Sequence, residues 1–197
     1  MRYDANRKIE TRRKVLAEAA RSIRESGPDR ISVAEVMAAV GLTHGGFYAH
    51  FASKDELVAA AIDEMFNDMR GRFARSTDGY GAREGLIRYL DFYLSARHRD
   101  ARGTGCPLPA LSADLARLGP AARARYGAGV ASLTARLAGQ IRQIGQEPAE
   151  SFAASVVAEL VGALALSRAV SDPAQSDAIL NTSLVAVKQR LGLEIAQ

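Results

Sequence analysis

The chain has 197 residues, of which 48% are hydrophobic and 24% charged. This composition is typical of a globular chain with a core, and it excludes a disordered chain, a collagen and a membrane channel. The longest apolar run near the C-terminal half, residues 160–166, is far shorter than the roughly 20 residues that span a bilayer. The sequence therefore predicts no transmembrane helix and no membrane partner.

The N-terminus and the cysteine content indicate the compartment. The first eight residues carry several charges and no apolar run follows them, so a secretory signal is not expected. The single cysteine, Cys106, can form neither an intrachain disulfide nor a cysteine-based zinc site, which is consistent with a reducing compartment. We therefore expect a cytoplasmic protein without a metal or cofactor.

The positive charge is concentrated near the N-terminus. Residues 1–54 contain 10 Lys or Arg against 6 Asp or Glu, which is a net charge of +4. Residues 55–197 contain 16 of each and are neutral. This asymmetry favours a polyanion as the partner of the first segment, although a merely basic, solvated surface would give the same numbers.

Helical periodicity dominates the chain, and no segment alternates between apolar and polar residues as a half-buried strand would. A first helix has an apolar stripe and ends at Gly27 and Pro28; the stripe is Ile9, Leu16, Ala19, Ala20 and Ile23. The capping box Ser32–Glu35 starts a second helix over 33–40. Gly41 provides a left-handed C-cap, and a third helix follows over 43–51.

A second capping box, Ser53–Glu56, starts a long helix with another apolar stripe: Val58, Ile62, Met65, Met69 and Phe73. A loop over 78–82 precedes a helix with its own stripe, which consists of Leu86, Tyr89, Leu90, Tyr93 and Leu94. The segment 103–109 is rich in glycine and proline and predicts a loop or an irregular helix entry. Further helices are expected over 109–118, 121–145, 150–169 and 173–191, the last capped by Asp172 with Pro173 in its first turn.

Two short helices joined by a tight turn and preceded by a longer helix are the layout of a helix-turn-helix DNA-binding domain. In the third helix Phe47 and Phe51 point to the core, whereas Gly45, Gly46 and Ala49 leave the opposite face nearly bare. Glycine destabilises a helix by about 1 kcal/mol relative to alanine, so a bare glycine face suggests close approach to a major groove. The predicted DNA-binding residues are Ser32, Thr43, His44, Gly45, Gly46, Tyr48, His50 and Lys54.

Residues 11–62 resemble the DNA-binding domain of the TetR (TetR/AcrR) family of bacterial regulators. The resemblance lies in the stretch 31–43 and in Gly45, Phe47, Tyr48, His50, Phe51, Lys54 and Leu57. It implies an all-α fold with a three-helix DNA-binding domain (1–54) and a helical domain for ligand binding and dimerisation (55–197). It also implies a homodimeric regulator, most often a repressor, that binds near-palindromic double-stranded operator DNA and responds to a small-molecule inducer.

The last two predicted helices carry apolar seams that suit either the core or a subunit interface. The resemblance favours the interface, in which the final two helices of each subunit form a four-helix bundle. The predicted interface residues are Val156, Val157, Leu160, Leu164, Leu180, Leu184, Val187 and Leu191.

An inducer pocket is expected among the central helices, although core packing explains the same aromatic side chains. The candidate lining residues are Tyr89, Phe92, Tyr93, Cys106, Tyr126 and Phe152. Cys106 stands at a predicted helix entry, where backbone amides stabilise a thiolate, and Gly105–Cys106 resembles an element of TetR-type regulators that sense oxidants or electrophiles. A small packed thiol is the alternative.

The sequence argues against two other classes of function. An enzyme is not expected, because the chain has only three histidines, no phosphate loop and no nucleophile elbow. His44 and His50 are six residues apart and cannot bind a metal as an i, i+4 pair would. An architectural DNA-binding protein without a ligand is disfavoured by the large neutral segment after residue 54.

Overall fold

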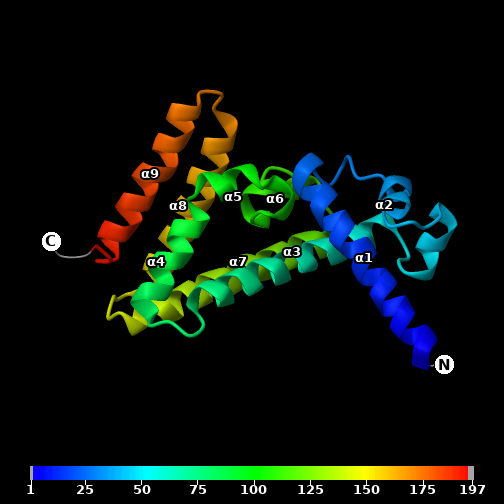
Figure 1. Cartoon of the computed structure of the whole chain (residues 1–197), viewed down its shortest axis with the longest axis horizontal. Coiled ribbons are helices and arrows are strands. Elements are labelled where there is room, and N and C mark those ends of the chain that lie inside the picture. The colour runs from blue at the N-terminus through cyan, green and yellow to red at the C-terminus, as the bar shows by residue number, and fades with distance from the viewer. Residues whose placement is uncertain (1, 195–197) are drawn as a thin grey trace. The chain divides into compact units, whose positions relative to one another are not determined.

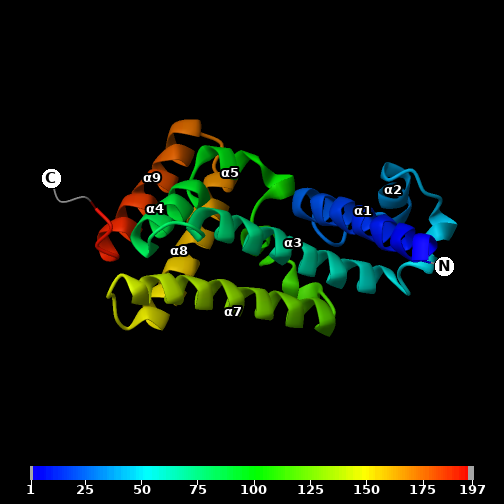
Figure 2. The same cartoon turned by 60° about the horizontal axis from the view of Figure 1, so that its bottom comes forward.

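A computed structural model describes residues 2–194, and the described chain is helical with no strand (Figures 1 and 2). Its internal contacts divide it into two compact units. Of the described residues, 2–68 and 103–127 form unit 1, and 69–102 and 128–194 form unit 2. The predicted all-α fold class is confirmed.

Unit 1 is built on three N-terminal helical elements: α1 (Arg2–Ser26), α2 (Val33–Ala39) and the short 3-10 helix η1 (His44–Ala49). The first part of α3 (Lys54–Thr77) belongs to this unit. It also contains α6 (Pro107–Leu111), the 3-10 helix η3 (Leu115–Arg117) and the start of α7 (Pro120–Gln143). Helix α1 packs against both α2 and α6, so a later segment of the chain shares a core with the N-terminal helices.

Unit 2 contains the end of α3, α4 (Ala82–Tyr93), α5 (Ala96–Asp100), the rest of α7, α8 (Ala149–Ala169) and α9 (Pro173–Arg190). The 3-10 helix η2 (Arg102–Thr104) lies where the chain passes back to unit 1. Helices α8 and α9 lie side by side as a hairpin (Figure 1), and α4 and α5 pack against this pair.

The predicted caps explain both ends of α2 and the starts of α3 and α9. The Ser32 hydroxyl accepts a hydrogen bond from the Glu35 amide, and Gly41 has a φ of +76°, the left-handed conformation that glycine adopts most easily. At the start of α3 the Ser53 hydroxyl accepts from the Glu56 amide, while the Glu56 carboxylate reaches back to the Ala52 amide. Asp172 caps α9 through the Ala174 amide, as predicted.

Several local predictions are wrong. Ile9 is 67% exposed, and Val15 takes the buried position of that stripe. No prediction anticipated α5, whose N-terminus is capped by the Ser95 hydroxyl. The helix expected over 109–118 is shorter and begins earlier, because α6 runs from Pro107, inside the expected loop, to Leu111. A proline such as Pro107 suits the first turn of a helix better than its interior.

Helix α8 has the length and the mean hydropathy (1.6) of a membrane-spanning segment. A core helix meets the same criteria, and the side chains of Val156, Leu160 and Leu164 are completely buried within unit 2. Helix α8 is therefore a core helix of this unit.

The boundary between the two compact units differs from the predicted domain boundary after residue 54. Helix α3 continues unit 1 to Asp68, and residues 103–127 return to this unit. The assignment of separate functions to 1–54 and 55–197 stays a prediction.

Candidate nucleic-acid interface

The predicted reading helix over 43–51 is shorter than expected and is a 3-10 helix, η1. Its buried side is formed by Phe47 and Phe51, which are 2% and 1% exposed and stack with ring centroids 5.5 Å apart. Two glycines in succession weaken a regular α-helix, which is consistent with the tighter 3-10 turn. The stacked rings fix which side of η1 faces outward.

The outward side of η1 presents polar and aromatic groups next to a bare surface. Thr43, His44, Gly45, Tyr48 and Ala49 are exposed, and Gly46 is half-buried. Tyr48 is 67% exposed, and its ring meets that of His44 edge to face at 6.2 Å. A hydroxyl, an imidazole and a phenol on one short exposed helix can donate hydrogen bonds to phosphates or base edges, while the glycines allow close approach.

Arg12 of α1 holds η1 in place and was missed by the sequence analysis. Its guanidinium donates to the carbonyl oxygen of His50 and pairs with the Glu56 carboxylate at 3.3 Å. It also lies 4.1 Å from the centroid of the Phe51 ring. A planar guanidinium makes these three contacts at once, so Arg12 joins α1, the end of η1 and the start of α3. Both partners are far from Arg12 along the chain, so no local sequence motif indicates this role.

His50 lies at the C-terminal end of η1 and is half-buried. Burial, followed by the positive charges of Lys8 and Arg12, lowers the pKa of its imidazole below the ordinary value, which favours the neutral ring. Its Nδ1 atom is buried and has no hydrogen-bond partner among the described residues.

Lys54 and Ser32, the other predicted contacts, lie at helix N-termini. The Lys54 ammonium is exposed and donates to the carbonyl oxygen of Asp29 at 3.1 Å. The Ser32 hydroxyl is engaged in the cap of α2. Both side chains are thus oriented by the protein itself, next to backbone amides that attract anions.

Most of the predicted subunit-interface residues are buried within the single chain, and their part in an interface stays a prediction. All except the half-buried Leu184 are at most 6% exposed; they are Val156, Val157, Leu160, Leu164, Leu180, Val187 and Leu191. These side chains pack within unit 2, so they have almost no surface for a partner. The large apolar side chains exposed on this helix pair are Leu166 (59%) and Val185 (49%).

The predicted pocket residues are divided between the two units. In unit 2, Tyr89 and Tyr93 are almost fully buried with their ring centroids 5.8 Å apart, and Phe92 and Phe152 are half-buried. In unit 1, Cys106 is 5% exposed at the N-cap of α6.

Tyr126, the other predicted pocket residue in unit 1, donates its hydroxyl to the Leu108 carbonyl at 3.0 Å. Burial and the neighbouring Cys106 raise the pKa of Tyr126 to about 12. A shared inducer pocket stays a prediction.

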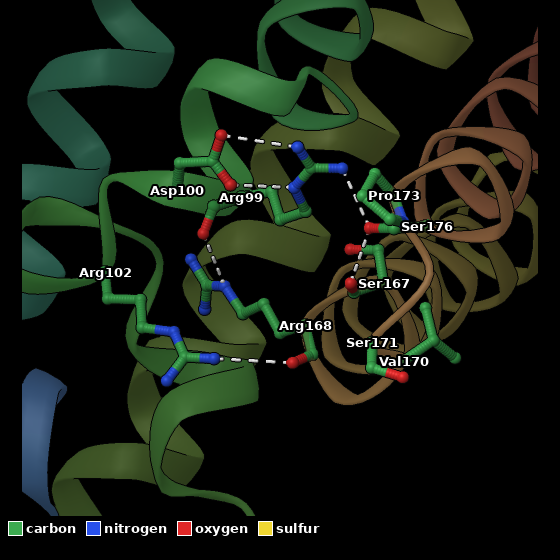
Figure 3. Close-up of a pocket in the computed structure, with 9 residues that line it drawn as sticks. All are labelled: Arg99, Asp100, Arg102, Ser167, Arg168, Val170, Ser171, Pro173 and Ser176. Atoms are coloured by element: carbon green, nitrogen blue, oxygen red, sulfur yellow. Dashed lines mark hydrogen bonds and ion pairs between the residues drawn. The ribbon is translucent and has the colours of Figure 1, made fainter.

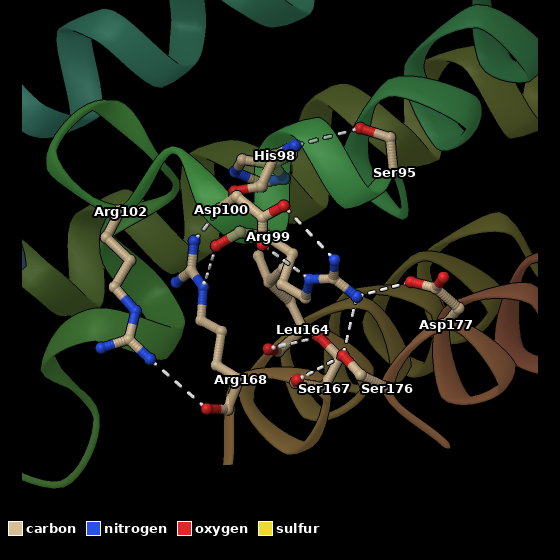
Figure 4. A network of polar contacts seen from close by, with 10 residues as sticks. All are labelled: Ser95, His98, Arg99, Asp100, Arg102, Leu164, Ser167, Arg168, Ser176 and Asp177. Atoms are coloured by element: carbon tan, nitrogen blue, oxygen red, sulfur yellow. Dashed lines mark hydrogen bonds and ion pairs between the residues drawn. The ribbon is translucent and has the colours of Figure 1, made fainter. Parts of the chain in front are cut away.

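A polar network in unit 2 holds α5 against the turn between α8 and α9 (Figures 3 and 4). Arg99 pairs with Asp177 at 2.6 Å and with Asp100 at 2.8 Å, and it also donates to the Ser176 hydroxyl. Arg168 donates to the carbonyl oxygens of His98 and Arg99. These contacts border a hollow of about 340 Å³.

A short exposed reading helix, locked onto a three-helix core, defines a helix-turn-helix DNA-binding protein. Residues 15–61 match the family described as "Bacterial regulatory proteins, tetR family". Residues 15–61 thus have the DNA-binding domain of the TetR family of transcriptional regulators.

Two curated relatives carry the same kind of description. The uncharacterised regulator YvdT of Bacillus subtilis is 29% identical over 44% of this chain and 46% of its own length. The regulator TtgR of Pseudomonas putida is 32% identical over 35% of this chain and 32% of its own length. The chain thus matches less than half the length of either relative.

Solved structures match nearly the whole chain. A TetR regulator from Chloroflexus aurantiacus is 26% identical with a TM-score of 0.81, covering 95% of this chain and 96% of its own. The reduced form of NemR from E. coli is 19% identical with a TM-score of 0.80, covering 91% and 96%. The second likeness shows the fold alone.

Proposed function

We propose that this protein is a cytoplasmic, ligand-responsive repressor that binds a near-palindromic operator as a homodimer and is released by a small-molecule inducer. The observation that carries this proposal is the exposed face of η1, where Tyr48, His44 and Thr43 surround two glycines on a helix fixed by stacked phenylalanines. In such a dimer the two reading helices would meet half-sites one turn of DNA, roughly 34 Å, or a multiple apart.

The dimer surface suggested by the structure differs from the apolar seam expected from the sequence. Exposed and half-exposed positions follow one helical stripe on each helix: Ser155, Ala158, Gly162 and Leu166 on α8, and Ala178, Thr182, Val185 and Gln189 on α9. Small side chains allow helices to approach closely, with Leu166 and Val185 as the apolar contacts. Replacing both with glutamate should convert a dimer into a monomer in sedimentation experiments. Ile9→Glu, at an equally exposed apolar position of α1, is the control.

The primary test is a titration of the purified protein against its own promoter DNA at several salt concentrations. Tyr48→Ala and Lys54→Ala should both weaken footprint-specific binding, and Lys54→Ala should also reduce the salt slope by about 0.9, the value for one phosphate contact. Tyr80→Ala and Arg97→Ala, exposed in unit 2, are matched controls. Binding no tighter than to random DNA, unaffected by either variant, would contradict the proposal.

Inducer release is tested by screening small molecules for loss of operator binding, with the expected pocket in unit 2 near Tyr89, Phe92, Tyr93 and Phe152. An architectural DNA-binding protein without a ligand would bind DNA but respond to none of them. The enzyme class stays disfavoured, since regulators of this family are typically not enzymes.

A second candidate function is redox or electrophile sensing through Cys106. One observation favours it: Cys106 lies in the same compact unit as η1, so a change at its sulfur acts within the unit that would contact DNA. Its burial argues for a packed thiol instead. Hydrogen peroxide or N-ethylmaleimide should release DNA from the wild type but not from Cys106→Ser; equal responses would exclude sensing by this cysteine.

A further inference from the structure

A second hollow in unit 2 has a clear chemical character. It measures about 430 Å³ and lies between the last turns of α3 and the C-terminal half of α4. Its lining residues are Arg72, Arg75, Ser76, Arg88, Asp91 and Phe92. Its volume lies within the range of about 300–1,000 Å³ found for small-molecule sites.

The charge at this hollow is positive after its neighbours are counted. Asp91 accepts a hydrogen bond from the Lys188 ammonium, and Arg88 pairs with the Glu84 carboxylate at 3.8 Å. The lining itself has three arginines, Arg72, Arg75 and Arg88, and one carboxylate, Asp91, which is already paired with Lys188. Among the described residues, Arg75 has no carboxylate partner. Its guanidinium lies over Gly71, 3.3 Å from the position that a Cβ atom of residue 71 would occupy.

The hollow of Figure 3 is different, although it also has three arginines. There Arg99 binds Asp100 and Asp177, and a third carboxylate, Asp172, caps the adjacent end of α9. Three positive charges meet three negative ones, so an added anion gains little. The net positive charge distinguishes the hollow between α3 and α4.

Phe92 adds an apolar surface beneath these charges. Its ring is half-buried and stacks on the His98 ring at 5.0 Å, and the Arg72 guanidinium lies 5.4 Å from its centroid. Arg88 is likewise held over the Tyr80 ring at 4.0 Å. Stacked guanidiniums lose little further freedom when they bind an anion, because their orientation is already restricted.

We propose that this hollow binds a small organic anion with an aromatic or other apolar body. Its carboxylate or phosphate accepts hydrogen bonds from Arg75 and Arg88, and its apolar part lies against Phe92. Planar guanidiniums match such oxyanions with two parallel hydrogen bonds. Because Phe92 is also a residue of the proposed inducer pocket, this site deepens the proposed function, while the binding step itself requires no DNA.

The test uses full-length protein at constant ionic strength, titrated with benzoate, phenyl phosphate and the uncharged benzyl alcohol while backbone amide shifts are recorded. Both anions should shift residues 72–76 and 88–92 saturably. Arg75→Gln and Arg88→Gln together should weaken binding at least about tenfold, the effect of one lost charge-assisted hydrogen bond. Arg97→Gln, an exposed arginine of α5 outside the lining, should change it less than twofold.

Three results would overturn the proposal: benzyl alcohol binding as tightly as benzoate, the double variant binding like Arg97→Gln, or shifts confined to other residues. Thermal unfolding of each variant separates a lost site from a lost fold. Arg75→Gln alone provides the cleanest comparison, because this exposed side chain has no carboxylate partner among residues 2–194.

Discussion

The reading helix η1 and the helix pair α8–α9 differ in where their apolar side chains lie. Phe47 of η1 and Phe51 just after it are buried, whereas the side chains of His44, Tyr48 and Ala49 are exposed. Most of the sequence predictions for DNA contact therefore fall on accessible groups. In α8 and α9 the apolar seam that looked like an interface is buried within the chain, and the accessible stripe consists mostly of small residues. In this helix pair the strong apolar pattern marks side chains of the core. An outer face that lacks such a pattern is not thereby excluded as a surface for a second subunit.

The largest expected effect comes from the anchor of η1. Phe47→Ala removes a side chain that is 2% exposed and should cost about 3–5 kcal/mol in urea unfolding. Tyr48→Ala, its exposed neighbour, should change the free energy of unfolding by about 0.5 kcal/mol or less.

Leu164→Ala in α8 tests the comparison directly, because it removes a fully buried side chain in unit 2 at a cost of about 2–5 kcal/mol. At a temperature where both variants are folded, Phe47→Ala should lose operator binding and Leu164→Ala should retain more of it. Equal losses would show that the anchor acts only through global stability.

The next effect concerns pH and unit 2. Burial lowers the pKa of His98 to about 4, although its Nδ1 contacts the Tyr93 carbonyl, while the unfolded chain has the ordinary value of 6.5. Between these two pH values the unfolded chain binds more protons at His98 than the folded chain does. The free energy of unfolding therefore falls as the pH drops from 6.5 to 4, and below pH 4 His98 causes no further loss. The difference of about 2.5 pKa units corresponds to roughly 3 kcal/mol.

Urea unfolding from pH 7 to pH 4 measures this loss. His98→Gln should flatten the profile in this window, whereas the exposed His44→Gln should leave it unchanged. A wild-type profile that His98→Gln does not alter would mean that other groups determine the acid sensitivity.

A smaller effect is expected for Arg12. Arg12→Lys keeps the charge but cannot bind the His50 carbonyl, pair with Glu56 and cover the Phe51 ring together. The ion pair is about 40% exposed and contributes little alone, so the loss of stability should be about 1–2 kcal/mol, mainly from the carbonyl bond and the ring.

Because Arg12 sets the position of η1, operator affinity in Arg12→Lys should also fall, by about tenfold, as measured by fluorescence anisotropy. Arg13→Lys, the exposed neighbour on α1, is the control. If both variants bind DNA alike, η1 is positioned by its phenylalanines alone.

Local signals predicted local structure well in this chain. The caps at Ser32, Ser53 and Asp172 and the left-handed Gly41 depend on neighbouring residues and are confirmed. The sequence could not place Arg12, whose partners are 38 and 44 residues away, because such contacts depend on how helices pack. The return of residues 103–127 to unit 1 is a similar long-range effect.

The smallest effect tests the bare face of η1. A Cβ at Gly45 would meet nothing within 4 Å, and the φ of this residue is not positive, so Gly45→Ala should fold without strain and gain about 0.4–1 kcal/mol of stability. The added methyl lies on the exposed face, where it should hinder close approach to a groove and weaken operator binding. Gly127→Ala in α7, equally open, should gain similar stability with unchanged DNA affinity. A Gly45→Ala variant that binds the operator as tightly as the wild type would mean that the glycines serve the 3-10 turn and not the contact with DNA.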